Sequence, residues 1–296
     1  MGNNKNKVFE EEHDDNLERI IILEKENIFL QEQIADLNNK LKEEEKMKSH
    51  FLSNMMNEIV NPFASILGLS KNISKSDGQN IEKIKSMANM IFTEAFELDF
   101  QLKNIFAAAE IEAGEVQLQL SDFKIKSLIE SSVDEVGLLS RRKVIDINII
   151  YSKDIEAGSM FINDFAKMKL ILVNLLSNAI KFGTPGVEII IDVYLDAKEF
   201  VFKIKNYGKG IDKENLKNIF DRFKQIETTI HSLNTGHGLG LSIVKAYCDI
   251  LNGKVAVESI KNEFVEFTVT IPEANNSGEE YFSSDIDLFE DEEEFF

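Results

Sequence analysis

The sequence has little cysteine and no long apolar run. Its single cysteine, Cys248, cannot form an internal disulfide, and its apolar neighbours in a helical pattern predict a buried thiol rather than a nucleophile. No window approaches the ~18 consecutive apolar residues of a membrane-spanning helix, and the first residues lack the apolar stretch of a signal peptide. We therefore expect a cytoplasmic protein without membrane insertion.

Basic residues are scarce as well. The 296 residues contain 33 Lys and Arg against 52 Asp and Glu, so the formal net charge is -19. Because no Lys/Arg-rich stripe is present that could neutralise phosphates and release their counterions, we expect no nucleic-acid partner. The hydrophobic share of 43% and the charged share of 29% are ordinary for a folded protein, and the length allows two domains.

Residues 1–46 are predicted to form an N-terminal coiled coil. A polar residue, Asn27, at a core position of the pattern favours a parallel dimer with a fixed register. The alternative is a single amphipathic helix packed on its own domain, which the highly polar surroundings disfavour. The apolar pattern is a seven-residue repeat whose two core positions hold Ile20, Asn27, Ile34 and Leu41, and Leu23, Leu30 and Leu37.

Residues 47–115 are predicted to form a helical hairpin. One helical pattern runs from Phe51 to about Asn72 and is interrupted by Pro62, and a second runs from about Asn80 to Glu110. The Ser-Asp-Gly sequence at 76–78 provides the turn. Two antiparallel helices cannot bury their apolar faces alone, so we expect a dimeric four-helix bundle.

Residues 116–273 change to short alternating and helical patterns. This mixture indicates an α+β fold, an α/β sandwich with helices layered on one mixed sheet. Residues 274–296 form an acidic, aromatic tail, either a solvated segment or a docking peptide. Strands are predicted at 116–120, 145–149, 187–194, 200–206, 254–260 and 266–272, and helices at 127–139, 164–182 and 242–251.

Three segments of this last part point to a nucleotide site. Asn174, Asn178 and Lys181 share one face of the predicted helix, where amide oxygens can coordinate a hard cation and the ammonium can meet phosphate. The segments 206–211 and 236–241 are glycine-rich, at a strand end and a helix start, where backbone N–H groups approach phosphate. A polar helix surface explains the first segment equally well, but the joint order of all three is a strong signal.

These segments resemble those of the sensor histidine kinases of two-component signalling, over about Met47 to Pro272. The helix Asn174–Phe182 is similar to the family's N box, and 206–211, 220–223 and 236–241 are similar to its first glycine box, F box and second glycine box. Residues 109–114 are similar to the joint between its helical and ATP-binding domains.

The resemblance implies a Bergerat-type ATP fold of the histidine kinase/GHKL type. It also implies Mg²⁺ held near Asn178, phosphate contacts from Lys181, and a mobile lid between Ile226 and Thr235. The ATP-binding residues that it implies are Asn174, Asn178, Lys181, Phe182, Asn206, Gly208, Gly210, Ile211, Phe220, Arg222, Phe223, Gly236, Gly238, Leu239 and Gly240.

Two positions depart from the family pattern. The family's first glycine box begins with Asp, whose carboxylate accepts a hydrogen bond from the adenine amino group. This sequence has the uncharged Asn206 at that position. The loss of a charge-assisted hydrogen bond is expected to weaken nucleotide binding by about 1.5–3 kcal/mol. Asn57 occupies the phosphoacceptor position of an H-box-like segment that is aligned by Glu58 and Pro62. Because an amide nitrogen is a poor nucleophile, we expect no autophosphorylation there. His50 lies one heptad earlier and is interpreted as a solvent-facing helix residue.

Glu58 and Asn61 remain as an acid followed three residues later by an amide. In the family this arrangement supports dephosphorylation of a receiver domain, with the amide orienting the attacking water, although helix capping near Pro62 explains the pair equally well. We therefore expect a degenerate, homodimeric histidine kinase that engages a response regulator receiver domain or a partner histidine kinase. The alternatives are a receiver phosphatase that uses Glu58 and Asn61, or an ATP-dependent kinase acting in trans on a partner's histidine.

Overall fold

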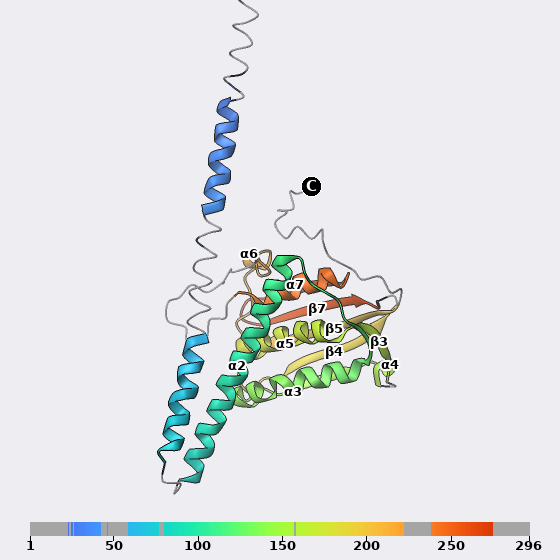
Figure 1. The fold of residues 1–296 in the computed structure, drawn as a ribbon. Helices are drawn as coiled ribbons and strands as arrows, with labels where there is room; N and C mark the ends of the chain where they lie inside the picture. The colour runs from blue at the N-terminus through green and yellow to red at the C-terminus, as the bar shows by residue number, and fades with distance from the viewer. Residues whose placement is uncertain are drawn as a thin grey trace, which may run out of the picture. The chain divides into compact units, whose positions relative to one another are not determined.

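Figure 1 shows the computed structural model, in which the chain divides into two compact units, Met1–Asn54 and Met55–Phe296. The lid, the acidic tail after residue 274, Ile20, His50 and the predicted site residues Asn57, Glu58, Arg222, Phe223 and Gly236 lie outside the described residues. The structure describes residues 23, 25, 27–42, 46, 59–76, 80–156, 158–221 and 238–274.

The described part of the first unit is helical over residues 27–42, as the heptad pattern predicts. One turn of this helix is bridged by a hydrogen bond of 3.0 Å from Gln31 Nε2 to Asn27 Oδ1. The heptad residues Leu30, Ile34 and Leu37 are 55%, 57% and 63% exposed. The helix is confirmed, and the parallel coiled-coil dimer stays a prediction.

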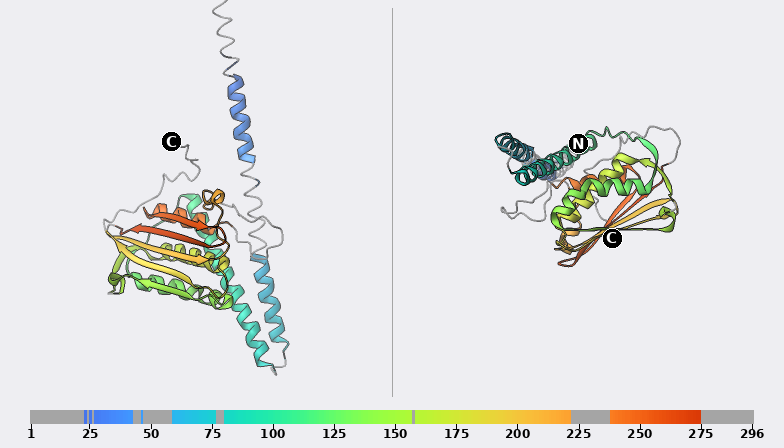
Figure 2. Two further views of the ribbon diagram at one scale, coloured as in Figure 1. Left: turned by 180° about the vertical axis from the view of Figure 1, so that it is seen from behind. Right: turned by 90° about the horizontal axis from the view of Figure 1, so that it is seen from below.

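The second unit begins with a helical hairpin. The helix over residues 59–74 lies beside the long helix α2, Ile81–Ala113, as Figures 1 and 2 show from several sides. The Asn80 side chain caps α2 by accepting a hydrogen bond from the backbone N–H of Lys83 at 2.9 Å. Gly114, with a φ of 65°, ends the helix in the left-handed conformation that glycine adopts without strain.

The expected interruption at Pro62 is wrong, because residues 59–74 are helical on both sides of it. The fixed φ of proline is compatible with a helix, although proline lacks the N–H donor and its ring crowds the carbonyl four residues earlier. The described hairpin is therefore two helices, and its four-helix bundle with a second chain stays a prediction.

The sheet of the second unit is mixed, as predicted. In the order β2-β4-β5-β7-β6, β2 and β4 are parallel and the other neighbours are antiparallel, and β1 and β3 form a separate antiparallel pair. The strands are β1 Leu120–Lys124, β2 Ile147–Tyr151, β3 Met160–Asp164, β4 Ile189–Asp196, β5 Glu199–Tyr207, β6 Lys254–Ile260 and β7 Phe264–Pro272. The helices are α3 Ile125–Lys143, α4 Lys153–Glu156, α5 Phe165–Phe182, α6 Lys213–Leu216 and α7 Gly240–Ile250.

The core lies between this sheet and the helices α3, α5 and α7, which cover one of its faces (Figure 2). Phe200 and Phe202 of β5 and Leu172 and Leu175 of α5 are all 0% exposed. Since alternate residues of a strand point to opposite faces, the row through Phe200, Phe202 and Ile204 faces the helices. The α/β sandwich is confirmed.

The predicted strand at residues 116–120 is wrong. Only Leu120 belongs to a strand, because side chains rather than a neighbouring strand satisfy this backbone: Asp164 Oδ2 accepts from Gln119 N at 2.8 Å, and Lys167 Nζ donates to Gln117 O at 2.7 Å. The short elements β3, α4 and α6 were not predicted.

Candidate functional site

Helix α5 carries the predicted row of polar residues. Its start is fixed by Asp164, whose Oδ1 accepts from the backbone N–H of Lys167 at 3.0 Å. Asn178 and Lys181 are partly buried, whereas Asn174 is 3% exposed. The Lys181 ammonium lies 5.5 Å from the ring of Phe182, which is 49% exposed. Asn174, Asn178 and Lys181 thus lie on one helix as predicted, but the Asn174 side chain is enclosed by protein.

The first glycine segment packs against the end of α5. Gly208 forms an isolated antiparallel bridge with Gly183, and a Cβ on Gly208 would lie 2.2 Å from the Phe182 carbonyl oxygen. Gly210 has a φ of 62°, and a Cβ there would lie 2.2 Å from the Ile260 carbonyl oxygen. Close backbone approach therefore requires glycine at both positions. Ile211 is held by its N–H, which donates to Ser259 Oγ at 2.8 Å.

The second glycine segment packs against the middle of α5. Gly238 has a φ of 69°, Leu239 is 2% exposed, and Gly240 is the first residue of α7. A Cβ on Gly240 would lie 2.5 Å from Asn174 Oδ1, so a larger residue there would displace the Asn174 side chain or the start of α7. Leucine at the N-cap has no side-chain oxygen for the first N–H groups of α7, which therefore remain suited to an anion.

Phe220 of the F-box-like segment is partly buried, and its ring centroid lies 6.4 Å from that of Phe267 on β7. Asn61, the described member of the predicted phosphatase pair, is exposed on the helix over 59–74. The structure thus brings the two glycine segments and the polar row of α5 together, while Asn61 belongs to the hairpin.

Asn206 lies at the end of β5, on the same helix-facing row as Phe202 and Ile204. Its side chain is buried, with 4% of the residue exposed, and its Nδ2 has no hydrogen-bond partner among the residues that the structure describes. An unpaired buried donor costs about 1–3 kcal/mol. Such a group in a native protein calls for an explanation, and a ligand acceptor supplies one.

Asn174 also contacts the helical hairpin. Its Nδ2 donates to Asn104 Oδ1 of α2 at 2.8 Å and to the Leu170 carbonyl oxygen at 2.9 Å. Both hydrogens of this amide nitrogen are therefore used within the protein. Asn104 is 7% exposed and shares one face of α2 with the buried residues Ala107 and Ile111. A polar residue on this apolar row was the sequence signal for the contact, which we did not predict.

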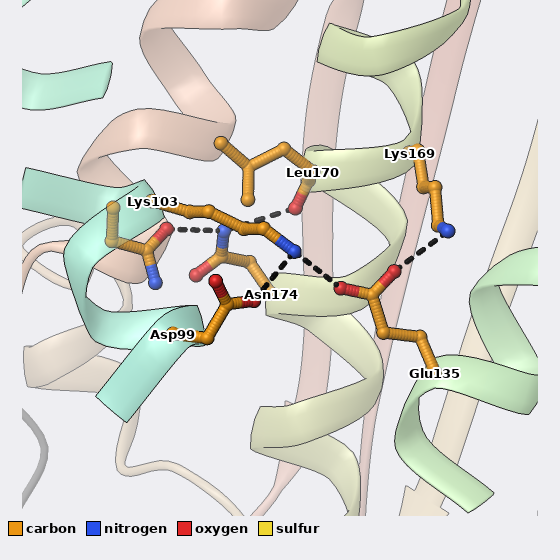
Figure 3. A network of polar contacts seen from close by, with 7 residues as sticks. Asp99, Lys103, Glu135, Lys169, Leu170 and Asn174 are labelled. Atoms are coloured by element: carbon orange, nitrogen blue, oxygen red, sulfur yellow. Dashed lines mark hydrogen bonds and ion pairs between the residues drawn. The ribbon is translucent and has the colours of Figure 1, made fainter. Parts of the chain in front are cut away.

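A charged cluster lies beside this amide pair (Figure 3). Lys103 Nζ of α2 contacts Asp99 Oδ2 at 2.8 Å and Glu135 Oε1 of α3 at 3.1 Å, and Glu135 Oε2 contacts Lys169 Nζ of α5 at 2.7 Å. Glu135 therefore joins three helices, α2, α3 and α5. This cluster could not be predicted from the sequence, because its members come together only in the folded chain.

The two central charges of the cluster stabilise each other's ionised forms. Partial burial raises the pKa of Glu135, but hydrogen bonds from Lys169 and Lys103 lower it by more, so its pKa lies below the ordinary value. The hydrogen bond to Asp99 raises the pKa of Lys103, against the opposing effect of burial, and Glu135 raises it further. Both groups are charged at neutral pH.

Comparison with known proteins agrees with this geometry. The model of the histidine kinase-, DNA gyrase B- and HSP90-like ATPase family matches residues 163–275, the region that contains α5 and both glycine segments. The chain is 27% identical over 230 residues to the circadian input-output histidine kinase CikA of Synechococcus elongatus, covering 76% of this chain and 30% of that protein. Residues 163–275 thus belong to this ATPase family, and the chain as a whole is similar to sensor histidine kinases.

Two further similar proteins show how much of the chain the likeness covers. The autoinducer 2 sensor kinase/phosphatase LuxQ of Vibrio parahaemolyticus is 27% identical over 233 residues, which cover 76% of this chain and 26% of LuxQ. The structure of full-length ShkA in complex with AMPPNP shares the fold, with a TM-score of 0.54, 19% identity, and coverage of 78% of this chain and 46% of ShkA. The chain spans less than a third of the length of these two curated relatives.

The described part of the chain has no group of three His, Cys, Asp or Glu residues that could hold a metal ion. Mg²⁺ bound with a nucleotide needs only one or two protein oxygens beside phosphates and water, which the partly buried Asn178 fits. Cys248 is 0% exposed and burial raises the pKa of its thiol to about 12, so the predicted inert core cysteine is confirmed. Within the described ranges, no helix is long and apolar enough to cross a membrane.

Proposed function

We propose that the chain is a degenerate histidine kinase, a homodimeric signalling protein that binds Mg·ATP and responds to that binding without phosphorylating residue 57. The observation that carries the proposal is that the first glycine segment and the described residues 238–241 of the second pack on α5 in a chain with Asn57 at the acceptor position. An amide nitrogen, whose lone pair is delocalised, does not attack the γ-phosphorus as a neutral imidazole does.

Each part of the site has a role in this proposal. The N-terminus of α7, opened by Gly238 and Gly240, receives phosphate oxygens, because its first N–H groups and the helix dipole favour an anion. Lys181 adds a positive charge, the Asn178 amide oxygen is a ligand for Mg²⁺, and Asn206 faces the base. Mg²⁺ supplies charge neutralisation of the phosphates when it is bound.

Nucleotide binding is proposed to act as a switch through Asn174. Both hydrogens of its Nδ2 are engaged, one by Asn104 of the hairpin and one by Leu170, and its Oδ1 lies against Gly240 at the start of α7. A nucleotide that binds Asn174 or moves the start of α7 therefore competes with the contact to α2. Binding at the site would then change how the ATP domain is held on the hairpin.

A second copy of the chain is the proposed partner of the hairpin. Val60, Phe63 and Leu67 of the helix over 59–74 are 54%, 55% and 58% exposed, and Phe92 and Phe106 of α2 are 62% and 64% exposed. Exposed large apolar side chains in this number on two helices favour burial in an interface. A four-helix bundle would cover them and would present a receiver domain or a partner kinase with the surface around Asn61.

Phosphatase activity toward a phosphorylated receiver domain is the second candidate function. It is favoured by the exposed Asn61, which can orient a water for in-line attack on an aspartyl phosphate, and by the name of the relative LuxQ, a kinase/phosphatase. Loss of phosphate from a labelled receiver should accelerate in the presence of the chain and slow again with Asn61→Ala. Equal rates with and without the wild-type chain would remove this candidate. Transfer of phosphate to a histidine of a second chain would instead support a kinase acting in trans.

Titration of the full chain with Mg·ATP tests the principal proposal. The wild type should bind, and Gly240→Ala should bind about tenfold more weakly, because its Cβ would displace Asn174 or the start of α7. Gly137→Ala on α3 is the matched control, since its Cβ meets no atom within 4 Å. The proposal fails if the wild type binds no nucleotide at millimolar concentration, or if both variants bind equally well.

A further inference from the structure

Among the described residues of the nucleotide site, Asn206 is the one whose side chain holds a fully buried donor without a partner. The strand places it firmly, since Asn206 pairs in register with Val265 of β7, and Gly208 anchors the next turn on Gly183. Its position is therefore set by the backbone, whereas its amide is not held by a hydrogen bond of Nδ2.

We propose that Asn206 makes the base site tolerant at position 6 of a purine, so that 6-oxopurine nucleotides such as GTP and ITP bind alongside ATP. This inference rests on the nucleotide binding proposed above and adds the class of base that the site takes.

The chemistry of the two side chains at this position explains the tolerance. A carboxylate only accepts hydrogen bonds, so it pairs with the 6-amino group of adenine and leaves the O6 of guanine or hypoxanthine without a donor. An amide carries one acceptor and one donor. Its Oδ1 accepts from the 6-amino group of adenine while its Nδ2 donates to a neighbouring ring nitrogen, and a half-turn of the amide lets Nδ2 donate to O6 and Oδ1 accept from N1–H.

The half-turn is open to Asn206 but not to Asn174. Rotation of Asn174 would break the hydrogen bonds from its Nδ2 to Asn104 at 2.8 Å and to Leu170 at 2.9 Å. The Nδ2 of Asn206 has no such bond within the described part of the chain, so a half-turn of its amide breaks no hydrogen bond of this nitrogen. The nucleotide rather than the protein then decides which way the amide points.

Competition binding of the Mg complexes of ATP, ITP and CTP to the full chain tests this inference. ATP and ITP differ at position 6 and N1, and we expect their dissociation constants to agree within about threefold, with CTP weaker. Asn206→Asp should favour ATP over ITP by about tenfold or more, since O6 then faces a carboxylate. Asn218→Asp, at an exposed position, is the control for added charge and should leave the ratio unchanged.

The outcomes separate this inference from the proposed function. Wild-type binding of ATP that exceeds binding of ITP by about tenfold would overturn the tolerance at position 6 and leave nucleotide binding intact. Binding of no nucleotide would overturn the proposed function and the inference with it. Because the ATP-to-ITP ratio of the wild type decides the matter alone, the test holds even if Asn206→Asp does not fold.

Discussion

The hydrogen bond between Asn104 of α2 and Asn174 of α5 couples the hairpin to the ATP domain, and Asn104→Ala should have two opposite effects. The substitution removes the acceptor 2.8 Å from Asn174 Nδ2 and leaves that 3% exposed amide with the Leu170 carbonyl as its described partner. One N–H of the amide becomes unpaired in a buried place. The free energy of unfolding should therefore fall by about 1–2 kcal/mol.

The affinity for Mg·ATP should change in the other direction. If nucleotide binding competes with the contact to α2, the wild type loses the hydrogen bond between Asn104 and Asn174 on binding, whereas Asn104→Ala has none to lose. About 1 kcal/mol of released cost corresponds to about a fivefold gain in affinity. A purely structural role of Asn104 would lower stability without raising affinity.

Thermal unfolding followed by circular dichroism and calorimetric titration measure the two effects. A loss of about 1 kcal/mol lowers the melting temperature by about 2–4 °C in a domain of 150–250 residues. Asn89→Ala, at an exposed position of the same helix, is the control. A double-mutant cycle with Asn174→Ala should give a coupling of about 1 kcal/mol. Equal melting temperatures for Asn104→Ala and the control, or a lower affinity for ATP, would refute the coupling.

Three further predictions concern the remaining contacts. Glu135→Gln should destabilise the protein by about 1 kcal/mol at neutral pH. Because the pKa of Glu135 lies below its ordinary value of 4.5, the stability difference between wild type and variant should persist above pH 4.5 and disappear as acid protonates the wild-type carboxylate. Melting curves recorded at several pH values measure this difference. Leu37→Asp should raise the dissociation constant of the dimer in sedimentation experiments, whereas Glu32→Ala, outside the heptad core, should not. Cys248 should react with a thiol reagent only after unfolding, because its side chain is buried and its thiol pKa is raised to about 12; rapid labelling of the folded chain would contradict this.

Periodic patterns allowed much of the ATP domain to be predicted. The bounds of β6 agree with the prediction because its residues alternate between the two faces of the sheet. Helix α5 was predicted at 164–182, and in the structure the Asp164 side chain caps its start. The strand β3 was missed, since Met160–Asp164 is short and three of its five residues are buried without strict alternation.

The partners of polar residues were less predictable than the elements that carry them. Helical spacing placed Asn174 on one face with Asn178, but it could not show that this face also meets Asn104, which lies 70 positions earlier in the chain. The glycines were predicted for the approach of phosphate, but the structure shows that they also allow close packing on α5, which the sequence alone did not reveal. Gly208 is required by the close approach of the Phe182 carbonyl oxygen, and Gly240 leaves room for the Asn174 side chain, in addition to any approach of phosphate.

The most direct test of nucleotide binding without self-phosphorylation is incubation of the full chain with ATP that carries a labelled γ-phosphate, at a Mg·ATP concentration that saturates the site in the titration. With Asn57 at the acceptor position, we predict no acid-labile phosphate on the chain above the level of a nucleotide-free control. Acid-labile phosphate on the wild type, and its loss in His50→Ala, would contradict the proposal and identify a working kinase with a different acceptor.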